Sequence, residues 1–290
     1  MKNYRFELEK GSKHILCPNC KKKKFKCYVS VDTGERVNPE KYGRCERISS
    51  CGYLMYPPSE ESDYVQWVQP EPKPFERVEP DFIPRGTVES TFRNYEQNVF
   101  VQYLRKMFGA DKTLDLISDY NIGTAKGGGA IFWQVDRNNN VRTGKIIYYG
   151  KDGKRLKDRN SWYIHNRIKP NFSLQQVLFG IHLTSKDKPV AIIESEKSAI
   201  MMSAYYPDVT WIASGGSNLL SVERLSMLPR LDYVYADEGM TIEWEKKVKG
   251  IFPDVKIDMR VEKAFLDGIL EKGDDVIDLE LVERQKINAQ

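Results

Sequence analysis

The 290-residue sequence has no apolar run long enough to span a bilayer, which takes about 20 residues in a helix. Its first fifteen residues, MKNYRFELEKGSKHI, lack the apolar segment of a secretory signal. We therefore expect a cytoplasmic protein with no membrane partner. Only five cysteines are present. In a reducing compartment such cysteines are expected to be metal ligands or buried thiols rather than disulfides.

A phosphate-binding loop of the G-x-x-x-x-G-K-[ST] type is also missing. The glycine-rich stretch KGGGA at residues 126–130 does not have that spacing and is predicted to form a hairpin turn. This absence argues against a P-loop ATPase or helicase in the chain. Any helicase partner would therefore be a separate chain.

Charge is distributed unevenly along the chain. Residues 1–58 hold 13 Lys/Arg against 6 Asp/Glu, and residues 95–182 hold 14 against 7. Residues 183–290 hold 14 against 20. Basic surface attracts phosphate backbones, and acidic clusters can hold a divalent cation. Ordinary scatter of surface charge is the alternative interpretation.

Four of the cysteines are arranged in two pairs. Cys17 and Cys20 form a C-x2-C knuckle, and Cys45 and Cys51 form a second pair with a longer gap. This spacing predicts a tetrahedral structural Zn²⁺ in a zinc ribbon over residues 1–58, with all four cysteines as ligands. Cys27 has no partner at knuckle spacing and is predicted to be a free thiol. His14 is an alternative ligand.

The knuckles flank the lysine-rich stretch KKKKFK, in which aromatic residues are interleaved. Lysines pair with phosphates and aromatic rings stack on bases, so single-stranded nucleic acid is the predicted partner. A solvated run of charge beside the aromatic core of a small module is the alternative. The predicted nucleic-acid contacts are Lys21, Lys22, Lys23, Lys24, Arg142, Lys145 and Arg155.

The remaining chain divides into three predicted regions. Residues 59–88 form a proline-rich acidic linker. Residues 89–182 form a basic α+β lobe, with helical patterns up to Tyr120 and then an antiparallel meander. From residue 183 to 290, apolar strands alternate with helices, which predicts a parallel α/β domain. The predicted fold is therefore multidomain, with a zinc ribbon, a mixed α+β lobe and a parallel α/β domain.

Polar residues follow three of the strands in the last region. Glu194 ends the strand VAII, the loop Ser214-Gly215-Gly216 ends the next strand, and Asp237 ends the strand after that. Function gathers at the carboxyl edge of a parallel sheet. Two carboxylates beside a glycine loop are a candidate Mg²⁺ site. Loop carboxylates without a metal are the alternative.

This arrangement resembles the toprim domain of DnaG-type primases, topoisomerases and some nucleases. IIESEKSA resembles the E-G-E-K-D-A form of phage and plasmid primases, ASGGSN resembles the glycine loop, and YADEG resembles the Asp-x-Asp motif. KGDDVIDLEL resembles the acidic turn that follows. With a zinc ribbon and basic lobe in front, the order is similar to primase-like proteins on mobile elements of Bacteroides-type bacteria.

The resemblance implies roles for the matching residues. Glu194 and Asp237 are the implied catalytic residues and Mg²⁺ ligands. The implied contacts to incoming nucleotides are Lys197, Gly215, Gly216, Asp275 and Asp278. Gly239 departs from the family pattern, because it stands where the second aspartate of Asp-x-Asp is expected.

The leading hypothesis is a primase-like DNA replication protein that transfers nucleotides with Mg²⁺ on a single-stranded template. A catalytically degraded toprim-like module that binds DNA for a mobile element is the second hypothesis, and Gly239 favours it. A toprim nuclease is the third. Topoisomerase activity is not favoured, since no strand-cleaving tyrosine stands out among the 16 tyrosines.

Overall fold

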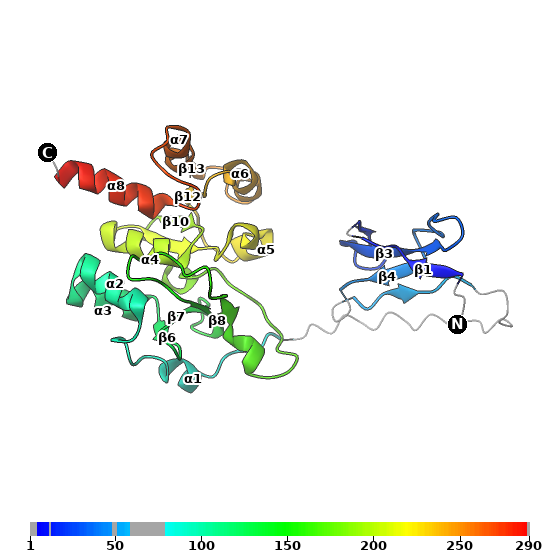
Figure 1. Ribbon diagram of the computed structural model, residues 1–290, viewed down its shortest axis with the longest axis horizontal. Helices are drawn as coiled ribbons and strands as arrows, with labels where there is room; N and C mark the ends of the chain where they lie inside the picture. Colours follow the sequence, from blue (N-terminus) through cyan, green and yellow to red (C-terminus); the bar gives the residue numbers. More distant parts are fainter. Residues whose placement is uncertain (1–4, 12, 48–50, 59–78, 289–290) are drawn as a thin grey trace. The chain divides into compact units, whose positions relative to one another are not determined.

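The computed structural model describes residues 5–11, 13–47, 51–58 and 79–288. It divides into two compact units, Met1–Glu76 and Arg77–Gln290 (Figure 1). Residues 59–78 of the predicted linker lie outside the described part. Among the described residues, no helix has the length and apolar character needed to cross a membrane.

The N-terminal unit is an antiparallel sheet in the order β1-β3-β4-β5, with β2 paired to the other end of β3. Its core consists of Phe25, Cys27 and the metal-binding knuckles rather than a large apolar layer. Glycine is needed at position 43, where β4 lies beside β3, because a Cβ there would be 2.2 Å from the Lys26 carbonyl oxygen. The strands are β1 Phe6–Leu8, β2 Ile15–Leu16, β3 Lys23–Ser30, β4 Gly43–Cys45 and β5 Leu54–Met55.

The second unit begins with three helices and a four-stranded antiparallel sheet in the order β6-β7-β8-β9. Gly109, at φ +80°, separates two of the helices. Strand β7 is buried along its whole length. The elements are α1 Arg85–Glu89, α2 Val99–Phe108, α3 Ala110–Asp119, β6 Ile122–Thr124, β7 Ala130–Val135, β8 Val141–Ile147 and β9 Trp162–Tyr163.

The strand–helix alternation predicted after residue 183 is present, and its strands pair in parallel in the order β11-β10-β12-β13. Central strand β10 is wholly buried, which explains its four apolar residues. The elements are β10 Val190–Ile193, α4 Glu196–Tyr205, β11 Thr210–Ala213, α5 Val222–Leu225, β12 Tyr233–Tyr235, α6 Thr241–Lys249, β13 Lys256–Asp258, α7 Arg260–Leu266 and α8 Val276–Asn288.

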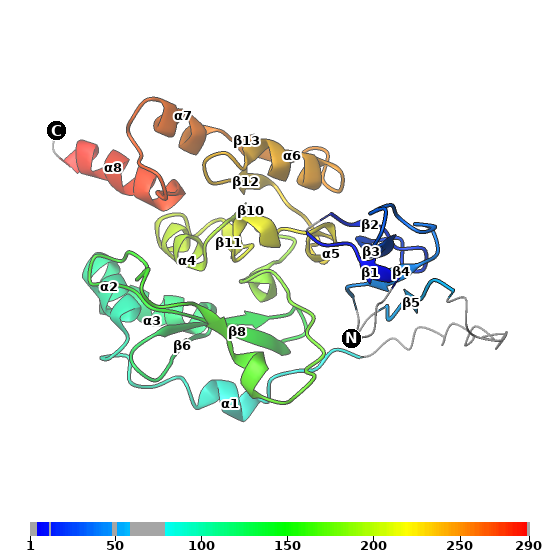
Figure 2. The same cartoon turned by 45° about the vertical axis from the view of Figure 1, so that its right-hand side comes forward.

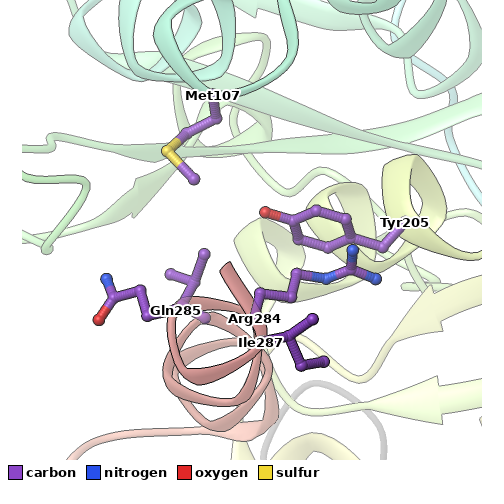
Figure 3. Close-up of a pocket in the computed structure, with 6 residues that line it drawn as sticks. Met107, Tyr205, Arg284, Gln285 and Ile287 are labelled. Carbon is purple, nitrogen blue, oxygen red and sulfur yellow. The ribbon is translucent and has the colours of Figure 1, made fainter. Parts of the chain in front are cut away.

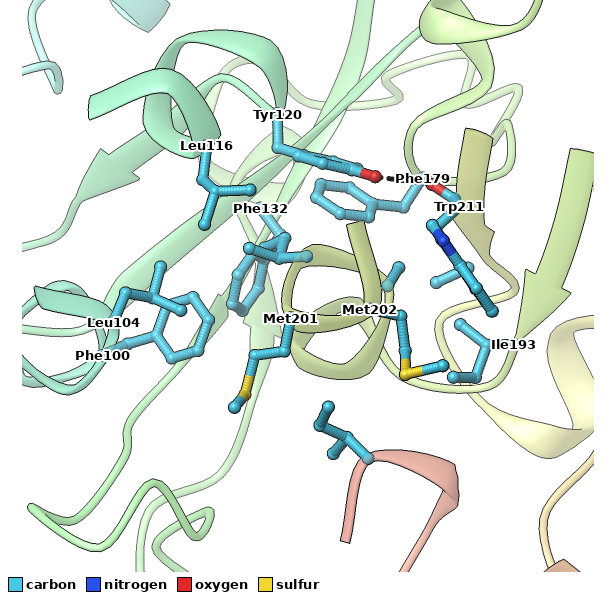
Figure 4. Packing of buried hydrophobic residues seen from close by; sticks show 14 of the residues in the cluster. Phe100, Leu104, Leu116, Tyr120, Phe132, Phe179, Ile193, Met201, Met202 and Trp211 are labelled. Atoms are coloured by element: carbon cyan, nitrogen blue, oxygen red, sulfur yellow. Dashed lines mark hydrogen bonds between the residues drawn. The ribbon is translucent and has the colours of Figure 1, made fainter. Parts of the chain in front are cut away.

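The antiparallel and parallel sheets of this unit share one hydrophobic core. Helix α4 lies between the α2–α3 pair and α8 (Figure 2), and it packs on β10 and β11. Phe100 and Phe132 from the first part meet Met201 and Met202 of α4 in one cluster (Figure 4). The Tyr120 hydroxyl donates to the Trp211 carbonyl at 2.9 Å. The two sheets are thus held as one unit, with the carboxyl edge of the parallel strands in a fixed place.

Candidate functional site

The four predicted zinc ligands come together in the N-terminal unit. Their sulfur atoms lie within 4.8 Å of one another, and the Cys17–Cys51 and Cys20–Cys45 sulfur separations are 3.7 and 3.9 Å. A tetrahedral Zn²⁺ with Zn–S bonds of about 2.3 Å places its sulfurs roughly 3.8 Å apart. The observed geometry therefore fits a structural Zn²⁺ with four cysteine ligands.

Local backbone hydrogen bonds shape this cluster. The Lys21 N–H donates to the Cys17 carbonyl at 3.0 Å, which closes the first knuckle. The Lys22 N–H lowers the pKa of Cys20 to about 6, whereas burial raises the pKa of Cys45 to about 12. Metal ligation requires the deprotonated form of each cysteine. Four thiolates so close together repel one another, so they need a cation between them.

The other two candidates in this unit have different partners. The Cys27 sulfur lies 3.8 Å from the Pro39 carbonyl oxygen and stays outside the four-cysteine cluster. The His14 ring is hydrogen-bonded to Glu46 at 2.6 Å. Zinc ligation is thus left to the four cysteines of the two knuckles.

In the second unit, Glu194 and Asp237 lie at the ends of neighbouring strands. Ile193 of β10 pairs with Tyr235 of β12, so both carboxylates emerge at the same edge of the sheet. The two carboxylates lie close enough to shift the pKa of each other. Burial and the charge of Glu194 raise the pKa of Asp237 to about 8. Without a cation, the Asp237 carboxyl is therefore protonated at higher pH than an ordinary aspartate.

The glycine loop after β11 surrounds Glu194. The Gly215 N–H donates to the Glu194 carbonyl at 2.9 Å, and the Ser217 N–H lies near the Glu194 carboxylate. Burial raises the pKa of Glu194, and this N–H opposes the shift. Gly215 and Gly216 adopt φ of +82° and +152°, which other residues rarely adopt.

Two buried side chains hold this loop from behind. The Arg224 guanidinium donates to the carbonyls of Ser214 at 3.3 Å and Leu219 at 3.1 Å. The Trp244 indole donates to the Ser217 carbonyl at 3.2 Å. The loop is therefore fixed in shape before any ligand arrives. Sequence reasoning missed both residues, since neither belongs to a recognisable motif.

The acidic turn before α8 approaches the same edge. The Ser198 hydroxyl donates to Asp275 at 2.5 Å, and the Asp275 N–H donates to Asp278 at 3.0 Å. The charge of Asp275 raises the pKa of both Glu194 and Asp237, after the larger effect of burial. The structure thus brings the predicted acids Asp275 and Asp278 to the predicted pair.

Lys197 lies beside this acidic turn, with its ammonium 3.9 Å from Asp278. Burial lowers the pKa of Lys197, but the charges of Asp275 and Asp278 outweigh it and raise the pKa above its usual value. The side chain is therefore a protonated cation in a mostly acidic surrounding. It is available as a counter-charge at this edge of the sheet.

The predicted nucleic-acid contacts have different environments. Lys21 to Lys24 are exposed, and so is Arg155. Arg142 is instead paired with Asp136 at 2.8 Å and stacked over Phe82. Lys145 is buried and bound to Glu196 at 2.9 Å. Charge counting along the sequence could not separate exposed cations from those with internal partners.

Gly239 follows the site in a turn with φ +75°. Its N–H donates to Glu262 at 3.0 Å, and no atom lies within 4 Å of a Cβ built there. The missing aspartate of the family pattern therefore leaves open space.

These residues fit Mg²⁺, which is usually bound by one or two carboxylates with waters and substrate phosphates completing its octahedral shell. The supporting observation is that Glu194 and Asp237 are both half-buried and that the charge of Glu194 raises the pKa of Asp237, since neighbouring carboxylates repel unless a proton or cation lies between them. Among the described residues, the four cysteines are the only group of three or more candidate ligands whose atoms lie within 4.8 Å of one another, so waters and substrate phosphates would have to complete a Mg²⁺ shell at the carboxylates.

One cavity of the second unit lies away from this edge. A cavity of about 320 Å³ opens at the C-terminal end of α4, between α2 and α8 (Figure 3). The Arg284 guanidinium stacks 3.9 Å from the Tyr205 ring within it. Glu194 precedes the other end of α4. The cavity is therefore separate from the carboxylate pair.

Two family models match the chain. Residues 4–65 match a zinc beta-ribbon finger, and residues 98–236 match a domain of unknown function, DUF6371. No curated protein matches the sequence. The second match includes Glu194 and the glycine loop, but it ends just before Asp237.

Several solved structures with a low degree of similarity are DNA primases. The primase fragment of the bacteriophage T7 primase-helicase protein is 13% identical, with 88% of this chain and 95% of that chain covered and a TM-score of 0.37. The E. coli primase catalytic core is 14% identical, with 67% of each chain covered and a TM-score of 0.35. A DNA primase domain from Pseudomonas aeruginosa is 14% identical, with 64% and 62% covered and a TM-score of 0.34.

Proposed function

We propose that this chain is a primase-like, Mg²⁺-dependent nucleotidyltransferase that acts on single-stranded DNA. The observation that carries the proposal is the half-buried Glu194–Asp237 pair at the carboxyl edge of a parallel sheet, with the glycine loop beside it. Such an edge is where α/β proteins bind their ligands. A half-buried pair of acids that repel each other lowers stability unless a cation or a proton lies between them.

Glu194 and Asp237 would hold the metal ion, with Asp275 close enough to add to the negative field. The bound Mg²⁺ would neutralise charge on the transferring phosphate during in-line displacement. Lys197 would balance the remaining phosphate charge from the neighbouring side. Gly215 and Gly216 contribute through backbone shape, since their N–H groups already bind Glu194 and Ser214 within the loop.

Template binding is assigned to exposed cations. Lys21 to Lys24 form an exposed run at the start of the longest strand of the zinc ribbon. Exposed lysines can pair with the phosphates of a flexible single strand. The zinc unit would therefore hold the template, and a separate helicase or replication initiator would supply it.

A second function is favoured by one observation. Gly239 removes a carboxylate from the turn after β12 and leaves open space there. A site with one ligand fewer binds Mg²⁺ more weakly. The chain would then be a DNA-binding replication accessory that retains the fold without the chemistry.

Primer synthesis on single-stranded DNA with Mg²⁺ and nucleotides tests the proposal. Wild-type protein is expected to extend primers, and Glu194→Gln is expected to lose at least 100-fold of that activity, about 2.7 kcal/mol of transition-state stabilisation. Glu238→Gln is the matched control, because this exposed carboxylate is next to Asp237 and is expected to have no effect.

Each other outcome assigns a different function. DNA binding without synthesis in the wild type would contradict catalysis and favour the accessory. Mg²⁺-dependent cleavage of the template that is lost in Glu194→Gln would identify a nuclease.

A further inference from the structure

Lys145 and Glu196 form a buried ion pair next to the glycine loop, and the proposed function does not use it. We propose that this Lys145–Glu196 bridge holds the glycine loop in place and thereby positions Glu194 for the cation. Lys145 is then a positioning residue and makes no contact with nucleic acid. The role in cation binding rests on the proposed function, whereas the role in holding the loop does not.

The sheet register determines which way Lys145 points. In the antiparallel meander, Lys145 of β8 lies opposite Phe132 of β7 and Tyr163 of β9. Residues opposite each other share a face, and Phe132 belongs to the core that both sheets share. Lys145 therefore points inward, toward the parallel sheet. Its side chain is 10% exposed and that of Glu196 is 2% exposed.

Every donor of the Lys145 ammonium has a protein partner. Nζ lies 2.9 and 3.1 Å from the two Glu196 carboxylate oxygens and 2.7 Å from the Gly215 carbonyl oxygen. An ammonium has three donors, and these three contacts use all of them. No donor is left for a phosphate, so the charge of Lys145 serves an internal role.

The bridge reaches Glu194 through the loop backbone. Gly215 packs so closely on the bridge that a Cβ there would lie 3.0 Å from a Glu196 carboxylate oxygen. The Gly215 N–H donates to the Glu194 carbonyl at 2.9 Å. Movement of the loop away from Lys145 would therefore move this hydrogen-bond donor away from Glu194.

The pair can be removed without leaving a buried charge. Loss of either partner alone leaves the other ionised and unpaired in the core, which destabilises the fold. The double variant Lys145→Met with Glu196→Gln leaves the net charge of the bridge unchanged at zero. It therefore removes the Lys145–Glu196 bridge without leaving an unpaired charge in the core.

Arg230 and Asp232 provide the matched control. This ion pair, with 2.8 Å between Nε and Oδ2, lies where the strands of the same parallel sheet begin, at the edge opposite the site. Arg230→Met with Asp232→Asn removes a pair of opposite charges from the same sheet. It leaves the glycine loop untouched.

Hydrogen exchange and Mg²⁺ titration of the full-length variants test the inference. In the bridge variant we expect the amides of residues 214–217 to exchange at least tenfold faster, and the Mg²⁺ dissociation constant to rise at least fivefold. The control variant is expected to match the wild type in both. The salt dependence of DNA binding is expected to stay unchanged, whereas loss of a phosphate contact would reduce its slope by about 0.7.

The outcomes separate this inference from the proposed function. If the amides of residues 214–217 exchange as slowly in the bridge variant as in the wild type, the bridge does not hold the loop in place. Faster exchange with an unchanged Mg²⁺ dissociation constant would overturn the positioning of Glu194. A wild type that binds no Mg²⁺ would overturn the proposed function and the role of the bridge in cation binding. Faster loop exchange in the bridge variant would still show that the bridge holds the glycine loop. A reduced salt slope would show that Lys145 contacts phosphate.

Discussion

At the scale of single residues, Asp237 controls how the metal-free protein responds to pH. Burial and the nearby Glu194 raise its pKa to about 8, above the value of about 3.9 for an unfolded aspartate. The folded state therefore holds a proton that the unfolded state releases. Its contribution to stability is complete below pH 4 and is lost as the pH rises toward 8.

Metal-free protein should thus lose unfolding free energy between pH 4 and 8, by up to about 1.4 kcal/mol per pH unit for one proton. Asp237→Asn cannot release this proton, so its decline should be shallower. Urea unfolding at a series of pH values, without added Mg²⁺, measures both slopes. Equal slopes in the variant and the wild type would show that Asp237 does not hold the proton.

Gly239 offers a gain-of-function change at the same site. Aspartate there has open space, but φ +75° makes a side chain cost about 1–2 kcal/mol. We expect Gly239→Asp to lower stability by that amount and to tighten Mg²⁺ binding. Gly239→Ala has a comparable backbone cost and no ligand, so it is the control. The measurement is the rise in melting temperature when Mg²⁺ is added. An equal rise in Gly239→Asp and Gly239→Ala would contradict this prediction.

The sequence predicted Glu194 and Asp237 from their positions after apolar strands, and the structure brings them together. It could not predict the Lys145–Glu196 bridge, because 51 residues separate the partners and only the register of β8 shows which way Lys145 points. Glu196 lies in the motif that contains Glu194, but its neighbours in the sequence do not show its burial. Local sequence patterns therefore do not predict ion pairs between residues that are far apart in the chain.

At the scale of elements, the two cysteine knuckles hold a ribbon that has little else in its core. Structural zinc contributes about 10–16 kcal/mol in small zinc modules, more than so small a core supplies. We expect one zinc per chain, and its loss in Cys17→Ser with Cys51→Ser should unfold residues 5–58. Calorimetry should show the transition of the second unit unchanged. An N-terminal unit that stays folded without metal would contradict this account.

Helix α4 shows why the sequence revealed the strands of the second unit but not its shared core. Residues Ser198 to Met202 are buried on every side, because α4 packs between both sheets and α8. A helix buried all round has no polar face, so its periodicity does not show how many neighbours it has. The sequence pattern therefore predicts helix α4 but does not predict which elements pack against it.

At the scale of the whole molecule, exposed cations of the zinc unit are expected to control binding to single-stranded DNA. Each phosphate contact contributes about 0.7 to the slope of log affinity against log salt. Replacing Lys21 to Lys24 with alanine should lower affinity and flatten the slope by up to about 3. The control replaces Lys246, Lys247 and Lys249 of α6 in the acidic region. An unchanged slope in the first variant would show that these lysines are only solvated charge.

The most direct test of the account is a thermal melt of the full-length chain with and without Mg²⁺ and nucleoside triphosphate. Ligand that binds only the folded state at 100 times its dissociation constant adds about 2.7 kcal/mol. We predict that Mg²⁺ with nucleotide raises the melting temperature of the second unit in the wild type, and that Glu194→Gln and Asp237→Asn abolish the rise. A wild type that melts at the same temperature in all conditions would contradict the claim that this carboxylate pair binds a metal ion.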